Sequence, residues 1–113
     1  MKKNVEQAKK WGISTKIAEV PQMQTVDTLN FHDKCKLTLF KFNNKWGCAQ
    51  SIELANQGWG FGCYPKFCDP YDSKEMAIYA AVTTIKKRVI EIGDKRNSDL
   101  LKALEKLLQP TLF

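Results

Sequence analysis

The feature that most constrains the fold is a pair of asparagines between two stretches that suit a pleated sheet. Residues 36–42 read KLTLFKF and residues 45–54 read KWGCAQSIEL, with Asn43 and Asn44 between them. Asparagine tolerates the positive φ angles that a two-residue hairpin turn requires. The sequence therefore predicts an antiparallel hairpin in which Phe42 lies opposite Lys45, and this pairing decides which side chains share a face.

A third strand is expected at residues 59–64, where WGFGCY alternates large residues with glycine before Pro65. A two-residue turn at Asn56 and Gln57 would connect it to the hairpin. The three strands then form an antiparallel meander. A meander of this size is stable only when one of its faces is covered.

Two helices are predicted after the strands. Asp72-Ser73-Lys74-Glu75 resembles a capping box with Asp72 as the N-cap. Apolar residues then follow at steps of three and four up to Ile92, and Gly93 stands where a C-terminal cap is preferred. A second helix begins at Asn97 or Ser98 and ends at Pro110. Five leucines form one face of it: Leu100, Leu101, Leu104, Leu107 and Leu108.

The predicted fold class is α+β: a three-stranded antiparallel meander packed against a long helix over about residues 73–92, with a C-terminal leucine-rich helix and an irregular N-terminal arm. A chain of 113 residues fits one domain. Residues 1–30 are expected to form an arm or wrapping segment, the first part either a short basic helix or a frayed end, and residues 31–113 the core. The chain has no stretch that could cross a membrane and starts without an apolar signal segment, so we expect a cytoplasmic protein with no membrane partner.

The predicted pairing divides the sheet into an apolar face and a mixed face. The apolar face, which the long helix covers, collects Cys35, Leu37, Leu39, Trp46, Cys48, Ile52, Leu54, Trp59, Phe61 and Cys63. Only Lys41 and Gln50 interrupt it. The mixed face carries Phe40, Phe42 and Tyr64 beside Lys36 and Lys45.

Two interpretations of the mixed face stay open. Phe40 and Phe42 are covered by the arm or by the leucine helix, or they are exposed and stack against bases. In the second case the glycines of the third strand let a partner approach closely. Stacking on aromatic side chains is worth ~1–3 kcal/mol per base.

The net charge of the chain supports the second interpretation, in which the mixed face binds nucleic acid. Eighteen Lys and Arg against twelve Asp and Glu give a net charge of +6. Two basic clusters lie near the end of the long helix, and each is either a solvated surface or a phosphate contact. The predicted nucleic-acid-binding residues are Lys36, Phe40, Phe42, Lys45, Tyr64, Lys86, Lys87, Arg88, Lys95 and Arg96.

A metal site is not predicted, although His32, Cys35, Cys63 and Cys68 have short spacings. In the meander Cys35 and Cys63 lie at opposite ends of the sheet, roughly 20 Å apart. The cysteines are expected to be reduced and to pack as small apolar residues. No residue stands in a recognised nucleophile motif, so we expect neither a catalytic residue nor a cofactor, and a non-enzymatic protein.

The leucine helix raises the question of association. A three-stranded sheet has room beneath it for about one helix and part of another. The leucine face is therefore expected either on the aromatic face of the sheet or against the same helix of a second chain. We predict a homodimer through Leu100, Leu101, Leu104, Leu107 and Leu108.

Residues 36–89 combine a strand, Lys45-Trp46 after a tight turn, a glycine-alternating strand and Asp72-Ser73-Lys74-Glu75 before AIYAA. This order resembles small meander-plus-helix accessory modules of plasmid- and phage-borne proteins, some beside ParB-like or DNA-methylase proteins. The resemblance implies an accessory of a mobile element. Residues 60–81 are also similar to a double-stranded-RNA-binding domain, whose lysine-rich helix start is represented here only by Lys74.

The favoured function is a non-enzymatic binding module for nucleic acid, single- or double-stranded. The alternative is a protein-binding accessory or inhibitor that occupies an acidic protein surface. Basic and aromatic surfaces serve both functions.

Overall fold

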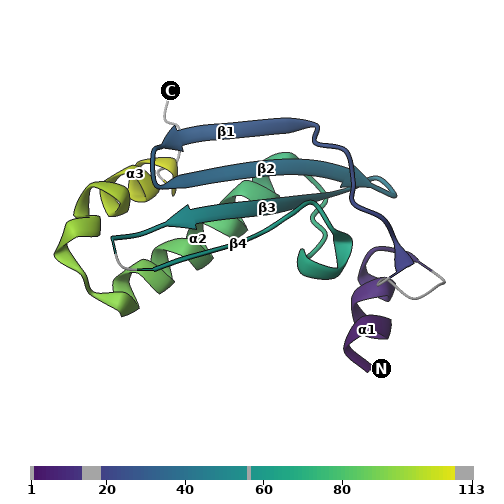
Figure 1. The fold of residues 1–113 in the computed structure, drawn as a ribbon. Helices are drawn as coiled ribbons and strands as arrows, with labels where there is room; N and C mark the ends of the chain where they lie inside the picture. The colour runs from purple at the N-terminus through teal and green to yellow at the C-terminus, as the bar shows by residue number, and fades with distance from the viewer. Residues whose placement is uncertain (1, 14–18, 56, 109–113) are drawn as a thin grey trace.

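The computed structural model describes residues 2–13, 19–55 and 57–108, and in helix α1 the side chains from Glu6 onward. The fold is α+β, as predicted (Figure 1). Four strands form one antiparallel sheet in the order β1-β2-β3-β4. The elements are α1 (Lys2–Lys10), β1 (Asp27–His32), β2 (Cys35–Phe42), β3 (Lys45–Glu53), β4 (Gly58–Phe61), the 3-10 helix η2 (Pro65–Phe67), α2 (Lys74–Ile92), the 3-10 helix η3 (Lys95–Asn97) and α3 (Ser98–Leu108).

The asparagine hairpin is confirmed. Asn43 and Asn44 have φ angles of 49° and 62°, and Phe42 pairs with Lys45. Asparagine takes this left-handed conformation at less cost than most side chains. The register continues unbroken to the pair Cys35 and Ile52.

The β3–β4 register differs from the predicted one by two residues. Gln50 pairs with Phe61 and Ile52 with Trp59. The predicted turn at Asn56 and Gln57 is wrong, because the Leu54 N–H donates to the Gln57 carbonyl across the connection at 2.7 Å. Asn56 itself lies outside the described residues. Since side chains alternate with a period of two, this shift leaves each residue of β4 on its predicted face.

The fourth strand, β1, is the main correction to the predicted fold. It crosses the expected boundary at residue 30 and pairs with β2, with an irregularity between Leu29 and His32. Only Leu29 and Phe31 of this short edge strand are apolar, and the irregularity follows Leu29, so the alternation is too short to reveal a strand in sequence. The sheet is therefore wider than the predicted meander.

The N-cap of helix α2 lies one residue after the expected one. Ser73 is the N-cap, and its hydroxyl accepts from the Met76 N–H at 3.1 Å. Asp72 instead pairs with Lys45. At the other end Gly93 has the expected left-handed conformation, with φ 69°.

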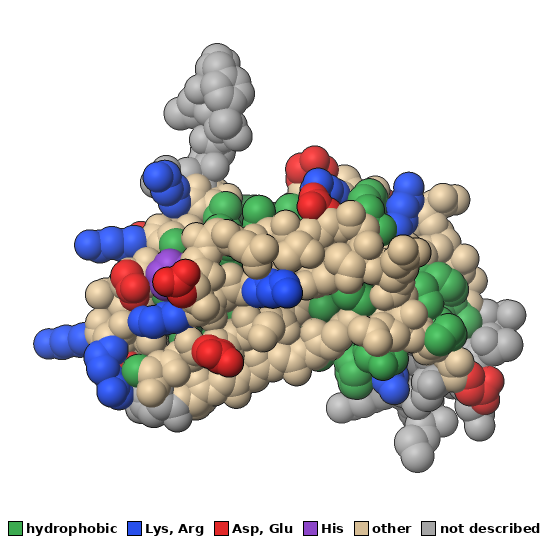
Figure 2. Space-filling model, turned by 45° about the horizontal axis from the view of Figure 1, so that its top comes forward, with side chains coloured by type: hydrophobic (Ala, Val, Ile, Leu, Met, Phe, Trp, Pro, Cys, Tyr) green, Lys and Arg blue, Asp and Glu red, His purple; other side chains and the backbone are tan. Residues whose placement is uncertain are grey.

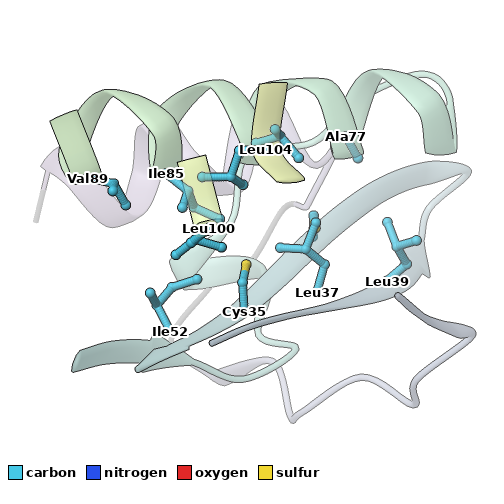
Figure 3. Packing of buried hydrophobic residues seen from close by; sticks show 11 residues of the cluster. Cys35, Leu37, Leu39, Ile52, Ala77, Ile85, Val89, Leu100 and Leu104 are labelled. Atoms are coloured by element: carbon cyan, nitrogen blue, oxygen red, sulfur yellow. The ribbon is translucent and has the colours of Figure 1, made fainter. Parts of the chain in front are cut away.

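Helix α3 packs beside α2 on the apolar face of the sheet. Leu100 and Leu104 are fully buried with Leu37, Ile52 and Ile85 (Figure 3). The prediction that the leucine face needs the aromatic face or a second chain is wrong, because β1 widens the sheet enough for two helices. A homodimer that used the partly exposed leucines of α3 stays a prediction.

The N-terminal arm contains a helix, α1, which ends at Lys10 and is followed by the left-handed Gly12 with φ 71°. Figure 1 shows α1 at the end of the sheet remote from the α2–α3 connection. The side chains of Ala8 and Trp11 are buried in a second core cluster with Phe40, Ala49, Cys63 and Cys68. Cys63 therefore packs in this cluster rather than in the one under α2.

Candidate nucleic-acid interface

The predicted stacking surface on the mixed face is closed. The Trp11 indole lies over the Phe40 ring with centroids 5.5 Å apart and planes 20° apart. Phe40 has no exposed surface, and Phe42 meets Trp11 edge to face at 6.4 Å. The prediction that Phe40 binds nucleic acid is therefore wrong, because the chain's own indole occupies the place expected for a base.

Glycines near this closed cluster leave room for other atoms of the same chain, not for a ligand. A Cβ atom on Gly47 would lie 2.3 Å from the Phe40 ring, and one on Gly60 would lie 2.9 Å from the Gln50 carbonyl oxygen. Both distances are too short for a real side chain. The alternation of large residues and glycine thus reflects close packing within the sheet rather than room for a ligand.

The rest of the mixed face is an open polar groove of about 310 Å³ beside the closed cluster. Thr28, Lys36, Thr38 and Ser51 line part of it. Lys36 is exposed there, as predicted from the alternation. Lys45 lies at the other end of the hairpin, where Asp72 neutralises it.

The basic residues at the end of α2 divide into paired and solvated ones. Lys86 lies 3.8 Å from Glu105, and Arg96 makes a fork with the Asp94 carboxylate at 2.7–3.2 Å. Lys87 and Lys95 are exposed. In this region acidic partners therefore neutralise some of the cations that the sequence suggested for phosphate binding.

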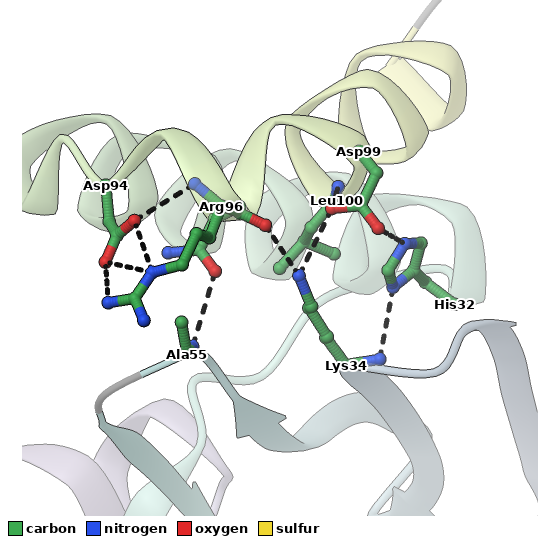
Figure 4. A network of polar contacts seen from close by, with 8 residues as sticks. His32, Lys34, Ala55, Asp94, Arg96, Asp99 and Leu100 are labelled. Atoms are coloured by element: carbon green, nitrogen blue, oxygen red, sulfur yellow. Dashed lines mark hydrogen bonds and ion pairs between the residues drawn. The ribbon is translucent and has the colours of Figure 1, made fainter.

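Arg96 also belongs to a network that fastens α3 to the β1–β2 hairpin (Figure 4). Lys34 Nζ donates to the Arg96 carbonyl at 2.8 Å and to Asp99 at 3.2 Å, and His32 Nε2 lies 3.3 Å from Asp99. These interactions lower the pKa of the Asp99 carboxyl, with the Lys34 hydrogen bond as the largest cause. Figure 2 shows the same mixture of charges gathered around the single His. His32 and Arg96 therefore have structural contacts here.

A different set of aromatic side chains is open to solvent. Trp59 and Phe61 are on β4, Tyr64 precedes η2 and Phe67 ends it; we call these four residues the open aromatic row. Phe67 lies 6.2 Å from Phe61 and 5.6 Å from Tyr64 between ring centroids. Phe67 is 52% exposed, and the other three are partly exposed. Trp59 and Phe61, expected on the face that the long helix covers, are only partly buried, because β4 is a short edge strand that α2 covers only in part.

Cations lie over this row at both ends. The Arg88 guanidinium is 4.2 Å from the centroid of the Trp59 ring. Lys66 Nζ is 5.1 Å from the rings of both Tyr64 and Phe67. Such cation–π contacts hold a positive charge beside an aromatic face.

A cavity of about 120 Å³ opens beside the row, between β3, η2 and α2. Phe61 and Phe67 line one side of it, and three alanines of α2 line another. Gln50, which interrupts the apolar face, also lines it. The Gln50 Oε1 atom is buried and has no hydrogen-bond partner within the described part of the chain.

The four cysteines are buried, and no disulfide joins them in the structure. Burial raises the pKa of Cys35 and of Cys48 to about 12, and it raises that of Cys68 still further. Thiols of this kind are poor nucleophiles near neutral pH. Across residues 2–13, 19–55 and 57–108, no three His, Cys, Asp or Glu side chains gather in a way that could hold a metal ion.

The structure thus brings Tyr64 and Arg88 from the predicted set into one surface, and places Lys36, Lys45 and the other cations elsewhere. Sequence reasoning missed Trp59, Phe61, Lys66 and Phe67. The aromatic residues were assigned to a covered face or lay beyond Pro65. Gln50 carried a usable signal, since it is a polar residue in an otherwise apolar strand face.

Comparison with protein-family models, curated proteins and solved structures finds no match for this chain. Among the described helices none is both long and apolar enough to span a membrane.

Proposed function

We propose that the protein is a non-enzymatic module that binds single-stranded nucleic acid along the open aromatic row. The observation that carries the proposal is a series of rings, Phe67 exposed and the others partly exposed, with cations over them, from Arg88 over Trp59 to Lys66 over Phe67. Proteins that bind single strands combine aromatic platforms for bases with cations for phosphates. The net charge of +6 favours the same class of partner.

The geometry of the row favours a single strand over a duplex. Trp59 and Phe61 are two residues apart on one face of an extended strand, so about 7 Å of chain separates them. Their faces stack only on bases that are unpaired and accessible. A duplex presents phosphates to cations but keeps its base faces stacked inside.

An accessory role on a plasmid or phage is part of the proposal. It rests on the resemblance of residues 36–89 to accessory modules, and neither the row nor the cavity bears on it. The proposal requires no cofactor.

The test is fluorescence polarisation with labelled single-stranded and double-stranded oligonucleotides over a series of salt concentrations. We expect the single strand to bind more tightly, with an affinity that falls as salt rises. Phe67→Ala should weaken binding about 5- to 150-fold, as expected for the loss of one stacked base. Lys66→Ala should weaken binding and reduce its dependence on salt.

Two control variants match these changes. Ile90→Ala removes an exposed apolar side chain from the opposite side of α2, and Lys102→Ala removes an exposed lysine from α3. Neither should change the affinity more than twofold. Absence of binding at low salt, or equal losses in the test and control variants, would contradict the proposal.

One observation favours the alternative function, capture of a protein surface. Val89, Ile90 and Leu101 line a mainly apolar groove of about 440 Å³ between α2 and α3, with Lys95 at its edge. Ile90 is 54% exposed. A protein partner with an apolar and acidic segment would fit there. Ile90→Ala therefore separates the two functions, since it should weaken only the protein complex.

A further inference from the structure

The cavity beside the open aromatic row carries a more specific inference, which rests on the proposed function. It lies where β3, the end of β4, η2 and the first half of α2 meet. Its volume of about 120 Å³ suits one flat ring system rather than a chain segment. Phe61 and Phe67 of the row both border it, and Phe61 also borders the polar groove on the other face of the sheet.

Small side chains on α2 create this space. Ala77, Ala80 and Ala81 face the cavity, and Thr84 continues the same side of the helix. Across from them lie the rings of Phe61 and Phe67, whose planes are tilted by 52° to each other. A planar ligand between the helix and these rings would contact apolar atoms on both sides.

Gln50 supplies the unpaired polar atom of the cavity lining. Its Oε1 atom is buried and has no hydrogen-bond partner among the described residues. An unpaired buried acceptor is unfavourable, and a ligand N–H would satisfy it. The pairing partner of Gln50 on β2 is Leu37, which is fully buried and offers no donor.

The cavity lining carries little uncompensated charge, which favours a neutral ligand with an N–H donor. Asp69 lines the cavity and lies 3.4 Å from Lys10 across the ion pair, so its charge is partly neutralised. Tyr71 lines it too, and burial raises the pKa of its phenol, which keeps it protonated. A phosphate is expected outside, near Lys66, rather than within these walls.

We propose that this cavity holds one adenine base. A glutamine amide matches adenine with two hydrogen bonds, accepting from the exocyclic amino group and donating to the adjacent ring nitrogen. The Phe61 and Phe67 rings flank the base, while Lys66 lies near the mouth for the attached phosphate. The base comes either from a strand bound along the row or from a free nucleotide.

The test compares two single strands that differ at one base. One carries a single adenine in a run of pyrimidines, and the other carries unsubstituted purine there, which lacks only the amino group. Wild-type protein should bind the adenine strand about 5- to 150-fold more tightly, the range for one paired base edge. Gln50→Leu keeps the size of the side chain and should bind the two strands within twofold of each other.

A second variant tests the cavity independently in case Gln50→Leu does not fold. Ala81→Leu fills the cavity from α2 while leaving Gln50 in place, and should also abolish the preference for adenine. The thermal unfolding midpoint of each variant reports whether it folds. If only one variant folds, that variant decides the result.

The outcomes separate the two proposals. If the wild type binds both strands equally and Phe67→Ala still weakens binding, the adenine site is wrong and the proposed function stands. If no strand binds, the proposed function is wrong, and titration of adenosine monophosphate decides the cavity. Binding of that nucleotide that Gln50→Leu abolishes supports a free-nucleotide site, and absence of binding overturns it.

Discussion

Two aromatic clusters on this small sheet have opposite relations to solvent. In the closed cluster Trp11 covers Phe40, and both side chains are almost completely buried. In the open aromatic row Phe67 is half exposed and Lys66 lies over its ring. Similar side chains therefore form a core on one side of the sheet and a candidate ligand surface at its edge.

The difference shows what decides whether an aromatic residue becomes part of the core or part of a candidate ligand surface. Aromatic residues become core when another segment of the chain can cover them, and Trp11, which directly follows α1, does this for Phe40. Beside β4, α2 presents alanines that leave the rings accessible. The clusters are also connected: the Trp11 Nε1–H donates to the Cys68 carbonyl at 2.9 Å, directly after η2. The closed cluster thus holds the segment that carries Phe67.

The sharpest way to break this comparison is to truncate one ring in each cluster. Phe40→Ala should lower the free energy of unfolding by about 3–5 kcal/mol, because a fully buried ring leaves a cavity. Phe67→Ala should lower it by less than about 1 kcal/mol. Urea unfolding measures both changes. Equal losses would mean that the clusters do not differ in burial as described.

Much of the contrast between the closed cluster and the open aromatic row could not be predicted from the sequence. The asparagine hairpin, the register of β2 with β3 and the faces of the strands follow from local turn chemistry and alternation. The covering of Phe40 does not, because it depends on where a distant tryptophan packs. The exposure of Phe61 likewise depends on how far α2 reaches across β4. The candidate site was predicted only at Tyr64 and Arg88, since the row is brought together by packing and not by a motif.

A second prediction concerns the contact that closes the cluster. Gly47→Ala should destabilise the protein by about 1–3 kcal/mol, because its Cβ atom would overlap the Phe40 ring. The double variant Gly47→Ala/Phe40→Leu should cost less than the sum of the single changes. Thermal unfolding gives all three values, and additive losses would show that the ring does not press on this glycine.

A third prediction uses the thiols beneath the sheet. Burial raises the pKa of Cys48 from 9.0 to about 12, so the folded state holds this proton more tightly than the unfolded state. Stability is therefore present below pH 9 and should fall as pH rises from 9 to 12, by up to about 1.4 kcal/mol per pH unit for each such thiol. Urea unfolding at pH 8, 9 and 10 measures the slope. Cys48→Ala should reduce the slope and Phe67→Ala should not; an unchanged slope in Cys48→Ala would contradict the assignment.

The smallest effect is expected for the tether between the clusters. The Gln7 side-chain amide donates to the carbonyls of Pro65, the first residue of η2, and Cys68, which follows its last residue. Gln7→Ala should cost about 1 kcal/mol in thermal unfolding, the usual value for such hydrogen bonds. The exposed neighbour Glu6 provides the control, and a Glu6→Ala loss of the same size would contradict a specific tether.

The central claim is that nucleic acid binds at the open aromatic row and leaves the closed cluster covered. Its most direct test is a titration of the isotope-labelled protein with a single-stranded oligonucleotide, followed through backbone amide chemical shifts. The largest changes should occur at Trp59, Phe61 and Phe67, with Phe40 and Gly47 nearly unchanged. Largest changes at Lys36 and Thr38 on the polar groove, at Ile90 between α2 and α3, or no changes at all would contradict the claim.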